Sequence, residues 1–361
     1  MQYPITMIQK LKHFAYHTRV IKRRYKLIPK IVLGYAKTLL LGQNVLRTIE
    51  FALLTECNSK CIMCYASKMK KEDDKYLSVE EYRNVWKQAS RLGAFSVILS
   101  GGEPTLRKDL FDIISVMDPK NTIFALVTNS LNLNKSFLTD LKVAGIETIH
   151  FSLDSTNELV NDQVRGAQGH FQKVIESIEI AKSLGMTVCL STVIMHNGMD
   201  KMKEMVCFAK ENDIGIVFSL ACVSGNWSKE RSVLLTKEEW EYVQSYMKAN
   251  PYIRSDWTIN FSMRQECPGG REKISISSYG DVMGCAMNYV SFGNVREEPL
   301  EKIWKRMWNF PDFKRKSPDC LIGADLEYIR KYIEPLSNLQ VPIQIDKHPT
   351  NPISFEKLEM K

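Results

Sequence analysis

Short apolar runs and helical segments alternate along residues 50–225. The runs are almost continuously apolar, which is typical of strands buried on both faces of a parallel sheet. The runs predicted to be strands are 50–54, 96–100, 122–127, 148–153, 187–195 and 215–221. Six such units in series predict an α/β fold, a partial (β/α)6 TIM-like barrel. In a barrel of parallel strands, the chemistry lies at the carboxyl ends of the strands.

Helix ends between these runs are also readable. Ser78 followed by Glu81 predicts a capping box at the start of one helix, and Gly93 stands where that helix should end. Gly145 marks the end of another helix. These signals place each helix between two predicted strands, as the barrel requires.

The pattern changes after residue 225. A helical bridge is expected over 226–260, and two short runs around the Gly280 turn predict a β-hairpin. An amphipathic helix follows at 300–308, and four prolines after Glu334 predict a tail that runs extended over the surface. The predicted domains are a basic N-terminal helical extension (1–48), the partial barrel (49–225), a bridge with a small α+β domain (226–333) and a Pro-rich tail (334–361).

The net charge of +8 belongs to the N-terminus. Residues 1–49 contain ten Lys or Arg and no Asp or Glu, which leaves 39 basic and 41 acidic residues in the rest of the 361-residue chain. Lys22, Arg23, Arg24, Lys26, Lys30 and Lys37 alternate with apolar residues. One interpretation is a cationic helix in peripheral contact with an anionic membrane. The alternative is a helix packed across the bottom of the barrel, and no nucleic acid partner is expected because no nucleic-acid-binding fold accompanies the charge.

Nine cysteines, no secretory signal and no long apolar span predict a cytoplasmic protein. A peripheral position at the inner face of the membrane is the alternative location.

Cys57, Cys61 and Cys64 form C-x3-C-x2-C directly after the first predicted strand. Three thiolates can hold a [4Fe–4S] cluster and leave one iron open to another ligand. A zinc site is the alternative, but zinc needs a fourth ligand and no Cys or His lies close in sequence.

This spacing resembles the signature of the radical S-adenosylmethionine (SAM) superfamily. The resemblance implies an enzyme that reductively cleaves SAM at its [4Fe–4S] cluster to a 5′-deoxyadenosyl radical, which abstracts hydrogen from a substrate. Met63 occupies the position where the family usually has an aromatic residue, and Met can also pack against an adenine ring.

Further elements resemble the family's SAM-binding motifs. Gly101-Gly102-Glu103-Pro104 is similar to the GGE motif, which contacts the SAM ammonium group. Thr128-Asn129 resembles the TNG element, with Ser130 in place of the glycine. By the same resemblance Ser152 and Arg165 contact the SAM carboxylate. The residues predicted to bind the cofactor are Met63, Gly101, Gly102, Glu103, Thr128, Asn129, Ser152 and Arg165.

Cys267, Gly280 and Cys285 follow C-x12-G-x4-C spacing, which resembles the auxiliary-cluster domains called SPASM and twitch. With Cys320 as a third ligand, the resemblance implies a second, auxiliary [4Fe–4S] cluster; ordinary buried thiols are the alternative. Its fourth ligand is Cys222, a non-cysteine side chain or the substrate.

Two residues are candidates for direct catalysis. Cys222 follows the sixth strand and is either a hydrogen-atom donor or small apolar filler. Asp154 follows the fourth strand and either transfers protons or braces a loop.

The leading hypothesis is therefore an oxidoreductase or epimerase of the radical SAM type. Its predicted partners are a small-molecule, sugar or lipid substrate and an electron donor such as flavodoxin or ferredoxin. The first alternative keeps the chemistry but takes a ribosomal peptide as substrate. The second is a non-catalytic iron–sulfur or zinc protein, which would have no use for the glycines and Glu103 of a SAM-amine pocket.

Overall fold

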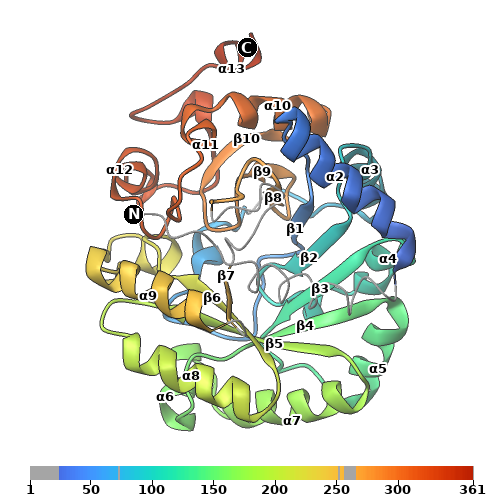
Figure 1. Cartoon of the computed structure of the whole chain (residues 1–361), viewed down its shortest axis with the longest axis vertical. Helices are drawn as coiled ribbons and strands as arrows, with labels where there is room; N and C mark the ends of the chain where they lie inside the picture. Colours follow the sequence, from blue (N-terminus) through green and yellow to red (C-terminus); the bar gives the residue numbers. More distant parts are fainter. Residues whose placement is uncertain (1–23, 72–73, 251–252, 256–265, 361) are drawn as a thin grey trace.

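The computed structural model describes residues 24–71, 74–250, 253–255 and 266–360. The strands of this part of the chain form one sheet in the order β11-β10-β9-β8-β1-β2-β3-β4-β5-β6-β7. Helices cover the outer face of the strongly curved parallel region (Figure 1). The bounds of the strands are β1 Thr48–Ala52, β2 Ser96–Ser100, β3 Ile123–Thr128, β4 Ile146–Ser152, β5 Thr187–Ile194, β6 Gly215–Leu220, β7 Ile253–Ser255, β8 Lys273–Ile276, β9 Asp281–Met283, β10 Val290–Asn294 and β11 Ile343–Gln344.

All six predicted barrel strands are confirmed, with ends that differ by no more than two residues. They pair in parallel from β1 to β6, and β7 adds a seventh parallel strand from the predicted bridge. The order of the sheet puts β1 and β7 apart, so the barrel is open, as a partial barrel should be.

The helices alternate with the strands because each has one apolar face to bury. The Ser78 hydroxyl accepts a hydrogen bond from the Glu81 amide, and the Glu81 carboxylate accepts one from the Ser78 amide, which confirms the capping box. Gly145 ends α5 in the left-handed conformation, also as predicted. The bounds of the helices are α2 Ile28–Leu41, α3 Val79–Arg91, α4 Leu110–Ser115, α5 Lys135–Ala144, α6 Glu158–Arg165, α7 His170–Ser183, α8 Met199–Glu211, α9 Lys237–Ala249, α10 Leu300–Asn309, α11 Pro311–Lys314, α12 Leu326–Tyr328 and α13 Phe355–Glu359.

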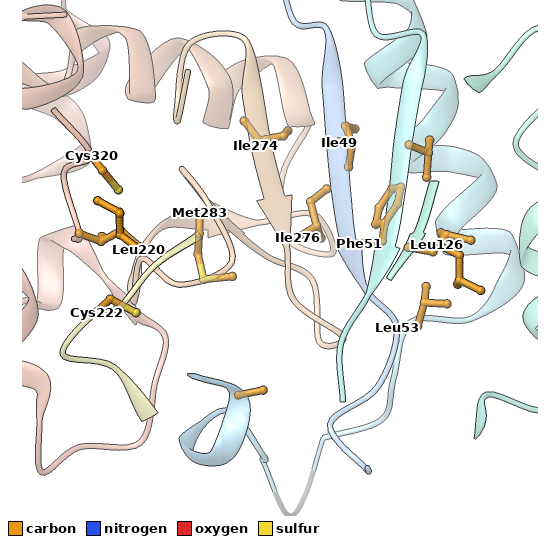
Figure 2. Close-up of a cluster of buried hydrophobic side chains, with 14 of the residues drawn as sticks. Ile49, Phe51, Leu53, Leu126, Leu220, Cys222, Ile274, Ile276, Met283 and Cys320 are labelled. Atoms are coloured by element: carbon orange, nitrogen blue, oxygen red, sulfur yellow. The ribbon is translucent and has the colours of Figure 1, made fainter. Parts of the chain in front are cut away.

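The predicted hairpin is the antiparallel pair β8 and β9, with Gly280 at a φ of 98° in its turn. Its first strand also pairs in parallel with β1, so the C-terminal part continues the barrel sheet. Figure 2 shows Ile49 and Phe51 of β1 beside Ile274 and Ile276 of β8 in one core. The hairpin is therefore held against the first strand of the barrel, directly before the predicted cluster loop.

The prediction of a tail that runs extended over the surface is wrong in part: most of its residues are exposed or half-buried, but short helices interrupt it and several apolar side chains enter the core. Leu336, Val341, Ile345 and Leu358 are fully or almost fully buried. The tail adds β11 to the edge of β10 and ends in the short helix α13. Burial of these apolar side chains outweighs the tendency of the prolines to keep the segment outside the core.

The basic N-terminal segment is helical over α2, whereas Lys22 and Arg23 lie outside the described residues. Ile31 and Tyr35 pack with Phe95 and Ile123, at the amino ends of β2 and β3. The helix is therefore packed across the bottom of the barrel, which was the second of the two interpretations. Within the described residues, no helix is long and apolar enough to cross a bilayer.

Candidate active site

The predicted site residues gather around one cavity of ≈ 260 Å³, at the carboxyl ends of the strands. Fifteen of the sixteen line it: Cys57, Cys61, Met63, Cys64, Gly101, Gly102, Glu103, Thr128, Asn129, Ser152, Arg165, Cys222, Cys267, Cys285 and Cys320. Thiols from two regions far apart in sequence thus face the same space. Asp154 is the predicted residue that does not line the cavity.

The loop that carries Cys57, Cys61 and Cys64 is clamped from two sides. Asn226, just beyond β6, donates its side-chain amide to the Cys61 carbonyl oxygen at 2.9 Å and its backbone amide to the Cys64 carbonyl oxygen at 3.0 Å. The Ser59 hydroxyl donates to the Arg165 carbonyl oxygen at 2.5 Å and lies 3.3 Å from Cys61 Sγ. Asn226 and Ser59 were not predicted, because nothing in their local sequence reveals contacts that form only in the fold.

The chemistry of the three thiols fits a cationic metal cluster. Burial, together with the negative charge of Cys61 and Cys64, raises the pKa of the Cys57 thiol to about 11. Burial also raises the pKa of Cys64. Three neighbouring thiolates are therefore costly unless positive charge binds them.

The two glycines of the GGE motif are required by a close approach of two backbones. A Cβ on Gly102 would lie 2.0 Å from the Glu56 carbonyl oxygen, and one on Gly101 would lie 2.6 Å from the Leu54 carbonyl oxygen. The Gly102 and Glu103 amides donate to these same two oxygens, each at 2.8 Å. The motif therefore positions the start of the cysteine loop, a role that the sequence pattern did not reveal.

Glu103 ties the ends of the second and third strands together. Its carboxylate is 1% exposed and accepts hydrogen bonds from the Thr105 amide and hydroxyl, the Thr128 hydroxyl and the Asn129 amide, all at 2.7–3.1 Å. Burial raises the pKa of Glu103, and the four donors oppose that rise. A carboxylate has about four acceptor positions, so most of its capacity serves the protein itself.

The third strand end connects to the cysteine loop through Asn129. Its side-chain amide donates to the Asn58 side-chain oxygen at 2.7 Å and lies 3.6 Å from Cys57 Sγ. Ser130 stands where the family has glycine and adopts a φ of 69°, the left-handed conformation that glycine would favour. The element thus keeps its backbone geometry despite the replacement.

Arg165 and Asp154 form a buried ion pair, with Arg165 Nη2 2.6 Å from Asp154 Oδ2. Asp154 Oδ1 accepts from the Val193 amide of β5 at 2.8 Å. Asp154 therefore braces Arg165 and the neighbouring strand, and a catalytic role for it is not supported. Arg165 also lines the cavity, so its guanidinium is a cation available to a carboxylate bound there.

Cys267, Cys285 and Cys320 form the second set of thiols. Burial raises the pKa of all three thiols. The negative charge of neighbouring thiols in this set adds to the rise in the pKa of Cys285 and Cys320, whereas nearby cations oppose the rise in the pKa of Cys267. Figure 2 shows Cys320 and Cys222 on either side of Leu220. Cys222 Sγ lies 3.7 Å from Met287 Sδ, and burial raises its pKa to about 11.

An ion pair that was not predicted joins β1 and β8 at the cavity. Lys273 Nζ of β8 is 3.0 Å from Glu50 Oε2 of β1, and the Ser100 hydroxyl donates to Glu50 Oε1 at 2.9 Å. Both charged side chains line the cavity, and the charge of Lys273 opposes the rise in the pKa of Cys267 and Cys285 that burial causes. The sequence signal is a charged residue in each of two strands, Glu50 in the middle of β1 and Lys273 at the start of β8.

The zinc alternative finds no support in this geometry. In the ranges that the structure describes, no three Cys, His, Asp or Glu side chains lie close enough together to hold a single metal ion. The thiols instead stand around a space that two sets share, as ligands of larger clusters would.

The comparisons with known proteins agree with the fold and the cysteine pattern. Residues 53–209 match the profile of the radical SAM superfamily, and residues 267–322 match that of SPASM, an iron–sulfur cluster-binding domain. The chain therefore belongs to the radical SAM superfamily. It is a radical SAM enzyme with a C-terminal SPASM domain, and these domains imply SAM, its [4Fe–4S] cluster and an auxiliary cluster as cofactors.

Two curated relatives come from Methanosarcina barkeri. The protein is 26% identical over 309 residues to an AdoMet-dependent heme synthase, which covers 78% of this chain and 87% of the relative. It is also 26% identical over 291 residues to an Fe-coproporphyrin III synthase, which covers 71% of this chain and 73% of that relative.

Solved structures share the fold at lower identity. Streptococcus suis SuiB, bound to its precursor peptide SuiA, has a TM-score of 0.56 and 21% identity, and the match covers 73% of this chain but 65% of SuiB. The enzyme anSMEcpe with bound AdoMet has a TM-score of 0.56 and 16% identity, with 87% of this chain and 95% of that chain covered. At these identities the likeness establishes the fold alone.

Proposed function

We propose that this protein abstracts hydrogen from a small organic substrate bound between its two sets of cysteines. The observation that carries the proposal is the single cavity that both sets line, together with the residues of the GGE, TNG-like and Arg165 elements. A purely structural metal site would need neither the shared cavity nor the Arg165 cation that lines it.

The residues take the following roles in this proposal. Cys57, Cys61 and Cys64 hold the SAM-binding cluster, and Cys267, Cys285 and Cys320 hold the auxiliary cluster. The cluster and SAM, when bound, supply reductive cleavage of the sulfonium and hydrogen-atom abstraction from the substrate. The chain's own contribution is to hold that cofactor and to keep the reaction away from water.

Four elements of the barrel would hold SAM. Arg165 lines the cavity, offers its guanidinium charge to the carboxylate and is kept in place by Asp154. Met63 and Ser152 line the same cavity and complete the pocket. The backbone of Gly101 and Gly102 lies where only glycine fits, next to the cysteine loop.

Cys222 is assigned to the substrate side of the cavity. Its Sγ lies 3.7 Å from Met287 Sδ and lines the cavity in which the substrate would bind. A thiol S–H in that position can donate a hydrogen atom to a substrate radical, and we assign Cys222 this role. Its raised pKa does not decide between a donor and a fourth auxiliary ligand, because burial also raises the pKa of the ligand thiols Cys285 and Cys320.

The substrate class is inferred from the relatives and from the cavity. The heme synthase and the Fe-coproporphyrin III synthase match most of this chain, and both names refer to small tetrapyrroles. Glu50, Lys273 and Ser152 give the cavity polar and ionised groups that suit a substrate with carboxyl or hydroxyl groups. Tetrapyrroles are the first substrates to test, ahead of sugars and lipids.

The decisive experiment is made without oxygen on the full chain reconstituted with iron and sulfide. With dithionite and SAM, the wild type should form 5′-deoxyadenosine, and Cys61→Ala should form none. Cys207→Ala, which removes an exposed thiol of α8, is the matched control and should retain the full yield. A wild type that holds reduced clusters but forms no nucleoside, with or without candidate substrates, would favour the non-catalytic alternative.

Iron content separates the two sets of thiols. The wild type should bind about eight iron atoms per chain, and Cys320→Ala about four, because one of two [4Fe–4S] clusters is lost. Substrate choice is then measured by the rise in nucleoside yield when Fe-coproporphyrin III or a panel of unmodified peptides is added. A rise with peptides alone would replace the small-molecule proposal by the peptide alternative.

A further inference from the structure

The helix α2 presents an outer face that is unusually apolar for an exposed surface. Fifteen large hydrophobic side chains are exposed in the described part of the chain, and seven of them lie within residues 25–41. They are 43–80% exposed: Tyr25, Ile28, Val32, Leu33, Leu39, Leu40 and Leu41. Single exposed apolar residues are ordinary, but a concentration of this kind marks an interaction surface.

Five of these side chains lie on one side of the helix. At about 100° per residue, Ile28, Val32, Leu33, Leu39 and Leu40 fall within an arc of roughly 140°. Lys37, also exposed, lies just beyond one edge of this arc, and the exposed Lys26 precedes the helix. The outer surface is thus an apolar stripe with lysines beside it, which we call the α2 stripe.

Contacts on the other side hold the helix in this orientation. Lys30 Nζ donates to the Ser90 hydroxyl at 2.9 Å and to the Ala94 carbonyl oxygen at 2.6 Å. Arg24 pairs with Glu147 at 3.2 Å. Because cations anchor the inner face, the helix cannot turn its apolar stripe inward without breaking these contacts.

The charge of the surrounding segment limits what can cover the stripe. Residues 1–49 carry ten positive and no negative side chains, whereas the rest of the chain carries 39 basic and 41 acidic residues. A second copy of the same segment would bring like charge against like charge. An anionic surface with an apolar interior matches both properties.

We propose that the α2 stripe docks on the surface of an anionic phospholipid bilayer. Its apolar side chains would enter the interfacial region, and Lys26 and Lys37 would meet the lipid phosphates. This is the geometry of an interfacial amphipathic helix, in which buried apolar area and electrostatic attraction to anionic lipids add together.

The stripe lies at the end of the barrel opposite the cavity. Arg24, Lys30 and the apolar inner face contact Glu147, Ala94, Phe95 and Ile123, which lie at or just before the amino ends of strands. The cavity opens at the carboxyl ends. Docking therefore anchors the enzyme without covering the cavity, and it goes beyond the proposed function without depending on it.

The test is co-sedimentation of the full chain with vesicles of phosphatidylcholine alone and of an equimolar mixture with phosphatidylglycerol. The wild type should bind the mixed vesicles at least about tenfold more tightly, since each lysine near an anionic surface contributes about 1 kcal/mol. The double variant Val32→Glu/Leu40→Glu should bind roughly a hundredfold more weakly, because two apolar side chains no longer enter the bilayer. Val143→Glu, at an 83% exposed position of α5, is the matched control and should bind like the wild type.

The outcomes separate the proposal from its rivals. Equal binding by the double variant, or no binding of the mixed vesicles by the wild type, would overturn it. A wild-type dimer in light scattering that Val32→Glu/Leu40→Glu dissociates would assign the stripe to a second copy instead. The nucleoside yield of these variants in vesicle-free solution should not change, so failure here is distinct from failure of the proposed chemistry.

Discussion

Removing one partner of the Glu50–Lys273 pair tests the description of the cavity most directly. The two charged atoms are 3.0 Å apart, and each side chain is 11% exposed. With an effective dielectric constant of about 20, their attraction is roughly 5 kcal/mol before the cost of desolvation. Lys273→Met leaves Glu50 buried without its cation, which for such pairs costs about 3–5 kcal/mol.

The lower end of that range is expected, because both groups line a cavity that water can enter. At about 2 °C per kcal/mol for a large domain, Lys273→Met should lower the midpoint of thermal unfolding by roughly 6 °C. Glu50→Gln should cost a similar amount. The double variant Glu50→Gln/Lys273→Met should recover most of the loss, since no uncompensated charge remains.

The assay is anaerobic thermal unfolding of the four proteins, read as a double-mutant cycle. Lys302→Met is the control: Lys302 also pairs with two carboxylates, at 3.4 and 3.6 Å, but is 50% exposed, so its loss should cost less than about 1 kcal/mol. Losses in the two single variants that simply add in the double variant would refute the reasoning. The reasoning would also be refuted if Lys273→Met lowered the midpoint of thermal unfolding no more than Lys302→Met does.

Two further predictions concern the barrel. Gly102→Ala should abolish iron binding at the first cluster, because the new Cβ would lie 2.0 Å from the Glu56 carbonyl oxygen. Gly42→Ala is the control and should leave the iron content unchanged, because no atom lies within 4 Å of its new Cβ. Burial, with the nearby charge of Arg165, lowers the pKa of His170 to about 4. In the unfolded chain His170 binds a proton near pH 6.5, whereas in the folded protein it stays neutral down to about pH 4. The free energy of unfolding is therefore highest above pH 6.5 and decreases as the pH falls below it. Between pH 7 and 5, urea midpoints should show the wild type losing about 2 kcal/mol more than His170→Gln; equal losses would contradict this account.

Much of the architecture was predictable because it depends on local pattern. Strands buried on both faces must be apolar along their whole length, so the six runs were visible, and the capping box at Ser78 is a contact between residues three apart. The cysteine loop and the GGE motif were found by the same means. The prolines of the tail predict an extended surface segment, whereas the core buries Leu336 and Ile345.

Contacts between distant segments could not be predicted. Asn226 and Ser59 hold the cysteine loop through backbone oxygens, and such contacts leave no repeated pattern in the sequence. The sequence leaves Asp154 as either an acid or base or a brace for a loop, since a strand end does not reveal that Arg165 lies 2.6 Å away. The pairing of β8 with β1, which brings Lys273 to Glu50, is likewise a product of the sheet order.

The sequence by itself indicated the class of chemistry, since three thiols within eight residues are close enough along the chain to hold one cluster. It also determined that residues 28–41 have an apolar and a cationic side. Only the tertiary structure decided that Arg24 and Lys30 face the barrel while Val32 and Leu40 face outward. Periodicity shows that a helix has two faces, but the partners available inside the fold decide which of them is buried.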